Sequence, residues 1–280
     1  RKRILTKLNN QEINIIFGTH SIFQKKVYFH KLGLIIIDEQ HKFGVNQRKR
    51  LSDKGGIDCD VLLMTATPIP RTLTMTIYGD MDISIIREKP KNRKPIKTYS
   101  KLEVKIEDVV KFIKKEIHLN NQIFWVCPLI EESKKLDHAS AVKKFEYLEK
   151  KFPNQVCLLH GKTDLEEKNK ILNNFLQNKF KILVSTTIIE VGIDFPNANV
   201  IVIENANKFG LSQLHQLRGR VGRGGNQSSC ILIYSGKLGK NSRARLEILR
   251  DTEDGFLIAE EDLRIRGAGD VLGLQQSGLP

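Results

Sequence analysis

The sequence of 280 residues contains little cysteine and no long apolar run. Its four cysteines are scattered without a CxxC pair, which argues against a disulfide framework and against a zinc knuckle. No apolar run approaches the roughly 18 residues that a membrane-spanning helix needs, so no membrane partner is expected. Internal repeats and low-complexity tracts are also absent from the sequence. The composition is that of a globular protein, and a length prior of about 150 residues per domain predicts two domains.

A complete phosphate-binding loop of the form GxxxxGK[ST] occurs nowhere in the chain. The segment VCLLHGKT at Val156–Thr163 resembles the end of such a loop, but the pattern needs a glycine where Val156 stands. The chain therefore lacks the element that grips the β- and γ-phosphates of a nucleotide. Because the chain also begins on Arg1 and not on Met, we expect an upstream part to be missing.

The chain carries a formal net charge of +14, from 46 Lys and Arg against 32 Asp and Glu. Such a balance favours a polyanion partner, most often nucleic acid, although a composition rich in Lys and Asn explains the bulk of the charge equally well. The distribution of Arg and Lys along the chain is more informative than the net charge. From Arg218 onward there are 8 Arg and 2 Lys, against 7 Arg and 29 Lys before it. Because guanidinium makes bidentate contacts with phosphate, this shift points to the C-terminal quarter.

Short apolar runs alternate with helix-compatible segments, a pattern typical of a parallel α/β sheet covered on both faces. The expected strands are Ile13–Phe17, Leu34–Ile37, Val61–Met64, Ile123–Val126, Val156–Leu159, Ile182–Val184, Val200–Ile203 and Ile231–Tyr234. The expected helices are Val104–Leu119, Ala139–Lys151 and Leu165–Gln177.

The segment EKPKNRKPIK at Glu88–Lys97 has the composition of a linker, with two prolines and no apolar periodicity before Ile96. Residues 89–115 also hold ten basic against three acidic residues, a local charge of +7. We expect the domain boundary there. The expected division is 1–88 for the first domain, 89–97 for the linker, 98–240 for the second domain and 241–280 for a helical hairpin and loop.

Two adjacent carboxylates follow the apolar run at Leu34–Ile37. Because ligands bind at the carboxyl ends of strands in α/β sheets, Asp38 and Glu39 are expected at a ligand site. In nucleotide hydrolases the first acid holds Mg²⁺ and the second orients the attacking water. A solvated strand end is the alternative, and the following Gln40 and His41 make the hydrolase interpretation the more specific one.

Arginine and glycine alternate in QLHQLRGRVGRGG, between Gln213 and Gly225. We expect Arg218, Arg220 and Arg223 to form a compact cationic loop that stabilises charge on a transferring γ-phosphoryl group. The glycines would let the backbone approach a phosphate. A solvated basic turn is the alternative.

Four other segments place polar residues where a ligand could lie. FGTHSIF at 17–23 is expected as a strand, a polar loop and a helix whose N–H groups suit nucleic-acid phosphates. VLLMTATP at 61–68 ends in hydroxyls that either join a phosphate-linked network or cap a turn. ILVSTTIIEVGIDFPNA at 182–198 joins a strand to a Ser/Thr cluster. LRIRGAGDVLGLQQSG at 263–278 is either an anion-facing loop or a capped helix end followed by a surface loop.

Together these motifs resemble those of superfamily 2 helicases, and within them the bacterial branch-migration helicases. DEQH resembles motif II, MTATPIPRTL (64–73) motif III and FGTHSIF a DNA-contacting motif. WVCPLIEES (125–133) and LHG (159–161) resemble the first motifs of the second motor domain, STTIIEVGIDFPNA motif V and QLHQLRGRVGRG motif VI. GFLIAEEDLRIRGAGDVLGLQQSG (255–278) resembles the translocation motif that these helicases share with transcription-repair coupling factors. The resemblance covers essentially the whole chain.

The resemblance implies an α/β fold of two RecA-like parallel-sheet motor domains, the first incomplete, with a C-terminal helical hairpin and loop. The catalytic set that it implies is Asp38, Glu39, Gln216, Arg220 and Arg223. In this set the two acids bind Mg²⁺ and activate water, and the arginines contact the γ-phosphate. Nucleotide contacts are implied for Gly192, Asp194, Arg220 and Arg223. DNA contacts and coupling are implied for Thr19, His20, His41, Thr65, Thr67, Thr187, Arg264, Arg266, Gln275 and Gln276.

The activity that the resemblance implies is ATP-driven translocation on double-stranded DNA, with ATP and Mg²⁺ as cofactors. Branch migration of Holliday junctions and regression of stalled replication forks would be its outcome. The implied partner is branched double-stranded DNA, single-stranded DNA-binding protein is a further candidate, and a cytoplasmic monomer is expected. Because the family's wedge domain and phosphate-gripping motif I are not in the chain, these residues alone are expected to have negligible ATPase activity. A coupling-factor-like translocase and a non-catalytic DNA-binding remnant are the alternatives.

Overall fold

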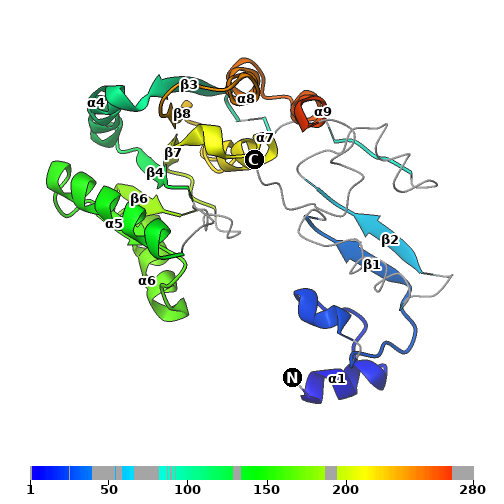
Figure 1. Cartoon of the computed structure of the whole chain (residues 1–280). Coiled ribbons are helices and arrows are strands. Elements are labelled where there is room, and N and C mark those ends of the chain that lie inside the picture. The colour runs from blue at the N-terminus through cyan, green and yellow to red at the C-terminus, as the bar shows by residue number, and fades with distance from the viewer. Residues whose placement is uncertain are drawn as a thin grey trace. The chain divides into compact units, whose positions relative to one another are not determined.

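The computed structural model describes residues 2–24, 26–39, 54, 59–65, 82–86, 88, 90–91, 93–128, 134–186 and 194–266. The chain divides into two compact units, residues 1–66 and residues 67–280, and each is described by itself (Figure 1). Among the described helices, none is both long and apolar enough to cross a membrane.

The described part of unit 1 contains two helical segments and a short parallel sheet. Its elements are α1 (Lys2–Asn9), η1 (His20–Phe23), β1 (Leu34–Ile37) and β2 (Asp60–Leu63). β1 and β2 pair in parallel over their whole length, from Leu34 opposite Asp60 to Ile37 opposite Leu63. The strands expected at 34–37 and 61–64 are confirmed, the second beginning one residue earlier than expected.

Only one face of this small sheet is buried. Ile35 and Ile37 are 6% and 3% exposed, whereas Leu34 and Ile36 are 55% and 57% exposed. The buried face packs against Leu32, Cys59, Val61 and Leu63. The continuous apolar run predicts a strand covered on both faces, and that expectation is wrong for the face of Leu34 and Ile36.

The strand expected at Ile13–Phe17 is not formed. This segment is irregular backbone between α1 and η1, and the side chains of Ile15 and Phe17 are 74% and 92% exposed. A strand is stabilised by a pairing partner and by packing on its face, and the described residues of unit 1 supply neither here. The helix expected after this segment is the single 3-10 turn η1.

Unit 2 contains a six-stranded parallel sheet with helices on both faces. Its strands are β3 (Ile96–Leu102), β4 (Gln122–Val126), β5 (Val156–Leu159), β6 (Ile182–Ser185), β7 (Ala198–Ile203) and β8 (Ser228–Tyr234). Its helices are η3 (Glu103–Lys105), α4 (Ile106–His118), α5 (Lys134–Lys151), α6 (Leu165–Leu176), η5 (Ala206–Lys208), α7 (Leu211–Arg218), α8 (Lys240–Asp251) and α9 (Gly255–Arg266). The strands lie in the order β3-β8-β7-β4-β6-β5, and all neighbours are parallel. The parallel α/β class expected from the alternating pattern is confirmed.

Two hydrophobic cores lie on the two faces of this sheet because its central strands are apolar on both sides. In β4, Phe124 and Val126 belong to a core shared with α6, α7, α8 and α9. Ile123 and Trp125 belong to a second core, shared with α4 and α5. All four side chains are 0% exposed. Burial of such side chains contributes about 1.5–3 kcal/mol each, so β4 anchors both layers.

Among the described strands, β3 is the one that the sequence pattern did not predict. It begins inside the segment expected as a linker, where Ile96 and Lys97 already pair with Ser228 and Ser229 of β8. As an edge strand it alternates buried and exposed residues and so lacks a continuous apolar run. The helices expected at 104–119, 139–151 and 165–177 correspond to η3 with α4, to α5 and to α6.

Candidate functional site

Asp38 and Glu39 lie directly after β1, and Thr65 lies shortly after β2. Because the two strands are parallel, the three residues lie at the same edge of the sheet. Glu39 has a left-handed φ of 51°, and its N–H donates to Oδ1 of Asp38 at 2.9 Å. A non-glycine residue in this conformation costs about 1–3 kcal/mol, and such strain gathers at functional sites. Paired carboxylates suit Mg²⁺, which proteins usually bind through one or two carboxylates together with phosphate oxygens.

Within the described ranges, no group of three or more His, Cys, Asp or Glu side chains is placed to hold a metal ion. The cysteines Cys59, Cys127, Cys157 and Cys230 carry free thiols. Burial raises the pKa of Cys230 to about 12, so this thiol stays protonated at neutral pH.

The segment with Thr19 and His20 is a tight turn in unit 1. Thr19 has extended backbone, and its carbonyl accepts from the N–H of Ile22 at 3.0 Å. A Cβ on Gly18 would lie 2.3 Å from Cδ1 of Ile22, so a side chain at this position would require the Ile22 side chain to move. His20 is the first residue of η1, and its side chain lies outside the described set.

The loop after α7 brings Asp194 next to Arg223. Nη1 of Arg223 lies 3.6 Å from Oδ1 of Asp194, and Nε of Arg223 donates to the carbonyl of Gly219 at 3.4 Å. Gly224 allows this approach, because a Cβ there would lie 2.0 Å from the carbonyl oxygen of Pro196. Asp194 and Arg223 come from two separate sequence motifs, and the fold brings them together.

Gln216 and Arg220 lie close to this contact in the chain. Gln216 is part of α7, and Arg220 follows the end of that helix by two residues. Both residues are half-buried. Gly222 then turns the chain with a φ of 78°, a conformation that favours glycine. The loop thus carries two of the three expected arginines, Arg220 and Arg223, on either side of a glycine turn.

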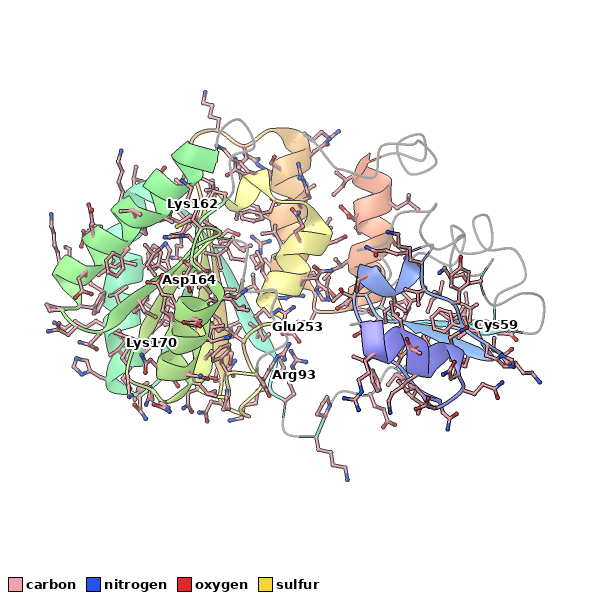
Figure 2. All side chains as sticks on the ribbon, turned by 90° about the horizontal axis from the view of Figure 1, so that it is seen from below. Cys59, Arg93, Lys162, Asp164, Lys170 and Glu253 are labelled. Atoms are coloured by element: carbon pink, nitrogen blue, oxygen red, sulfur yellow. The ribbon has the colours of Figure 1, made fainter. Side chains whose placement is uncertain are left out.

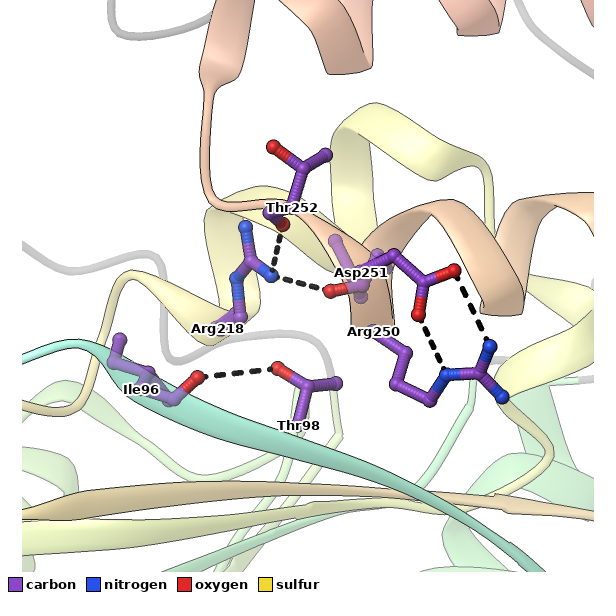
Figure 3. Close-up of polar contacts among 7 residues, drawn as sticks. Ile96, Thr98, Arg218, Arg250, Asp251 and Thr252 are labelled. Atoms are coloured by element: carbon purple, nitrogen blue, oxygen red, sulfur yellow. Dashed lines mark hydrogen bonds and ion pairs between the residues drawn. The ribbon is translucent and has the colours of Figure 1, made fainter.

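Arg218 does not belong to the cationic surface of this loop. It is 2% exposed, and its Nη1 donates to the carbonyls of Leu249 and Thr252 at 2.5 and 2.8 Å (Figure 3). Its Nη2 lies 3.1 Å from Nδ1 of His215. Burial lowers the pKa of the Arg218 guanidinium from its usual value. The expectation that Arg218 faces an anion is wrong, because carbonyls at the end of α8 hold it inside unit 2.

The chain that leads into β3 is tied to the same region. Nη2 of Arg93 donates to the carbonyl of Gly219 at 3.3 Å. The N–H of Ile96 donates to the carboxylate of Glu253, which follows α8. Arg93 and Glu253 are both labelled in Figure 2. The start of β3, the arginine loop and the turn between α8 and α9 therefore meet.

The helices α8 and α9 pack with α7. Ser212 of α7 donates through Oγ to Oδ2 of Asp262 in α9 at 2.7 Å, and Asp262 is 7% exposed. Arg264 lies on α9, and its Nη2 pairs with Glu261 at 2.6 Å. Because α9 ends at Arg266, residues 263–266 are helical and not part of the loop that the sequence suggests. The rest of that expected loop lies outside the described residues.

A buried ion pair that sequence reasoning missed lies where β4 and β7 end. Nζ of Lys144, in α5, lies 2.7 Å from Oε1 of Glu204, and the thiol of Cys127 lies 3.7 Å from Oε2. The ammonium group also lies 5.4 and 5.0 Å from the ring centroids of Trp125 and Tyr147. Glu204 directly follows an apolar run, so the strand-end criterion could have found it. No sequence signal marks Lys144.

The end of β6 carries two buried hydroxyl groups. Ser185 and Thr186 are 0% and 2% exposed, and neither hydroxyl has a hydrogen-bond partner among the described residues. Buried polar groups of this kind mark a place where a ligand or an ordered water supplies the partner. Thr187, expected to contact DNA, follows directly and lies outside the described residues.

Other expected site residues also fall outside the part of the chain that the structure describes. They are His41, Thr67, Gly192, Gln275 and Gln276, together with the side chain of Arg266. Their roles stay predictions.

Comparison with known families matches the two parts of the chain to helicases. Residues 1–76 match the DEAD/DEAH box helicase family, and residues 104–225 match the helicase conserved C-terminal domain family. The solved structure of S. cerevisiae Dbp5 bound to RNA and ADP BeF3 shares the fold, with a TM-score of 0.57 at 15% identity over 94% of this chain and 66% of that one. The chain therefore has the fold of the superfamily 2 helicase motors, with two RecA-like domains, as expected.

Similarity to one helicase extends over the whole chain. The ATP-dependent DNA helicase RecG of Bacillus subtilis (strain 168) is 49% identical over 282 residues, which cover 100% of this chain and 41% of the relative. RecG of Thermotoga maritima is 47% identical, covering 100% of this chain and 36% of the relative. The solved structure of RecG bound to a three-way DNA junction matches with a TM-score of 0.72 at 42% identity, over 98% of this chain and 36% of that one. The chain spans about two fifths of the length of these curated relatives. It belongs to the RecG family.

Proposed function

We propose that this chain carries the motor part of a RecG-type, ATP-dependent DNA helicase that translocates on double-stranded DNA. Its work would be branch migration of Holliday junctions and regression of stalled replication forks, with single-stranded DNA-binding protein as a further partner. The observation that carries the proposal is the similarity to RecG over the whole chain. Because the matched relatives are RecG proteins, this proposal is favoured over a coupling-factor-like translocase.

In the proposed mechanism, Asp38 and Glu39 act at the carboxyl end of β1. Asp38 would hold Mg²⁺, and Glu39 would orient the attacking water and accept its proton. When bound, Mg²⁺ neutralises the charge that develops on the phosphate oxygens. Glu39 adopts a left-handed conformation and its N–H donates to Oδ1 of Asp38, and both acids lie at one edge of the sheet because they directly follow β1.

Arg220 and Arg223 contact the γ-phosphate in this proposal, and Gln216 belongs to the same catalytic motif. Arg223 is supported by its geometry, because Asp194 holds its guanidinium at 3.6 Å while 34% of the Arg223 side chain stays exposed. A γ-phosphate carries more charge than the Asp194 carboxylate and forms stronger charge-assisted hydrogen bonds with guanidinium. Asp194 is therefore the group that positions Arg223 before nucleotide arrives.

DNA contacts and coupling belong to the remaining expected residues of both units. In unit 1 the residues proposed to contact DNA are Thr19, His20 and Thr65. At the end of α9 they are Arg264 and Arg266. We keep the proposed domain division at 1–88, 89–97, 98–240 and 241–280, with the difference that β3 already begins at Ile96, inside the expected linker. It is supported by the family matches, which end at residue 76 and resume at residue 104.

The experiment that tests this function is the substitution Glu39→Gln in a chimera in which this chain replaces the matching segment of Bacillus subtilis RecG. We expect ATP hydrolysis to fall by about 10²–10⁴-fold, because a general base is lost, while binding to forked DNA is retained. Glu166→Gln on the exposed first turn of α6 is the matched control and leaves hydrolysis unchanged. Hydrolysis that survives Glu39→Gln would show that the carboxylate assignment is wrong.

A further inference from the structure

Positive charge is concentrated at one edge of the sheet in unit 2. Residues 89–115 contribute +7 of the chain's net charge of +14. The described part of this segment leads into β3, forms β3 and η3, and continues into α4. β3 is the last strand on its side of the sheet, so one of its edges has no neighbouring strand in that sheet.

The strand β3 presents two lysines and a tyrosine on the same face. Lys97, Tyr99 and Lys101 alternate along the strand and are exposed, Tyr99 by 43%. Tyr99 and Lys101 lie opposite Ile231 and Ile233 of β8, which belong to the core beneath α4 and α5. The three exposed side chains therefore lie on the α4 face of the sheet.

The helix α4 covers the same face of the sheet and also carries exposed lysines, among them Lys114. Val109, Val110 and Ile113 pack on the sheet, which leaves Lys111 and Lys115 exposed on the outer side of the helix. We call Lys97, Tyr99, Lys101, Lys111 and Lys115 the basic surface.

Three acidic residues lie in the same segment as the basic surface, and one of them, Glu107, interacts electrostatically with Lys111. Glu107 accepts from the hydroxyl of Tyr147 at 2.7 Å and pairs with Lys151 at 3.2 Å, so its charge is engaged by α5. These bonds lower the pKa of the Glu107 carboxyl from its usual value. Glu103 and Asp108 are the other acids of the segment and are exposed. The ion pairs found among the described residues include none of the basic-surface lysines.

We propose that the basic surface binds the sugar-phosphate backbone of double-stranded DNA, at a place separate from the site residues at the strand ends. Lys97 and Lys101 are four strand residues apart, about 13 Å, which spans about four phosphates along the axis of one DNA strand. Lysine acts as a flexible point charge, and the Tyr99 hydroxyl donates to phosphate oxygens as tyrosines commonly do. Such contacts position the duplex without reading its sequence. The choice of DNA as the polyanion rests on the proposed function.

The test is the affinity of the 280-residue chain for a fluorescent duplex of about 20 base pairs, measured by anisotropy between about 50 and 200 mM salt. The double substitution Lys97→Gln and Lys101→Gln removes two charges and keeps the side-chain bulk. We expect the slope of log K against log salt to become shallower by about 2, with binding weakened equally for duplexes of unrelated sequence. The matched control is Lys168→Gln with Lys170→Gln on α6, which packs on the opposite face of the sheet, and its slope stays unchanged. Lys170 is labelled in Figure 2.

Three outcomes would overturn the proposal. Equal losses in both double variants would mean that net charge alone governs binding. Equally tight, lysine-dependent binding of a polyglutamate probe would make the basic surface a site for acidic protein. No binding of duplex by the unmodified chain would also count against it, whereas ATP hydrolysis in the chimera still tests the proposed function independently. If the double variant does not fold, Lys101→Gln alone gives the same test with an expected slope change of about 1.

Discussion

Arg218 and Arg223 lie five positions apart in the chain and have opposite surroundings. Arg218 is 2% exposed and bound by backbone carbonyls, whereas Arg223 pairs with Asp194 and stays open to solvent. The arginine–glycine pattern predicts cations near a phosphate, and it cannot tell which arginine is buried. That choice depends on the carbonyls of Leu249 and Thr252, which lie 31 and 34 residues further along the chain.

The substitution Arg218→Ala is expected to lower the free energy of unfolding of the chain by about 3 kcal/mol. Hydrogen bonds from a charged group are worth about 1.5–3 kcal/mol each, and their loss leaves two carbonyls without their donor. Urea denaturation followed by circular dichroism measures the change. Arg264→Ala is the control, because its side chain is 76% exposed and its surface ion pair contributes about 0–1 kcal/mol. Equal effects of the two substitutions would contradict the buried role of Arg218.

At the scale of elements, the apolar runs predicted every described strand except β3. β1 and β5 have the bounds expected from the sequence, because each is a compact apolar run. The sequence pattern did not reveal β3, because Lys97 and Lys101 occupy exposed positions of the strand and interrupt any apolar run. The strand prediction at Ile13–Phe17 was wrong for the opposite reason. The segment is apolar, but the described residues of unit 1 offer it no strand to pair with.

The loop between α7 and β8 depends on the absence of a side chain at Gly224. In Gly224→Ala the new Cβ would meet the carbonyl of Pro196 at 2.0 Å, so the backbone must move and the contact of Arg223 with Asp194 is weakened. Overpacking of this kind costs about 1–3 kcal/mol, and each kcal/mol lowers the melting temperature by about 2–4 °C. Gly239→Ala is the control, since nothing lies within 4 Å of a Cβ there. A thermal melt in which both variants match the unmodified chain would refute the close-approach argument.

At the scale of the whole molecule, the candidate site residues fall into two groups, one in each unit. Asp38 and Glu39 belong to unit 1, and Asp194, Arg220 and Arg223 belong to unit 2. The motifs predicted all five residues, but only the fold brings Asp194 to Arg223, because the two lie on different segments at one edge of the sheet.

The 280 residues tested alone are expected to hydrolyse ATP negligibly, even with duplex DNA present. No complete GxxxxGK[ST] loop occurs in the sequence, so the acids and arginines have no partner that grips the β- and γ-phosphates. Phosphate release with and without DNA measures the activity, and the chimera with Bacillus subtilis RecG is the positive control. Sustained, DNA-stimulated turnover by the chain alone would contradict this expectation.

The pairing of β3 with β8 has a consequence for how the protein is made. β3 ends at Leu102 and its partner begins at Ser228, so β3 leaves the ribosome well before the strand that it needs. Synthesis at about 5–20 residues per second leaves β3 without that neighbour for roughly 6–25 s. During this time its backbone donors and acceptors are open to other chains. Lysines on an edge strand discourage such pairing, so Lys97 and Lys101 would keep the nascent chain from aggregating until β8 arrives.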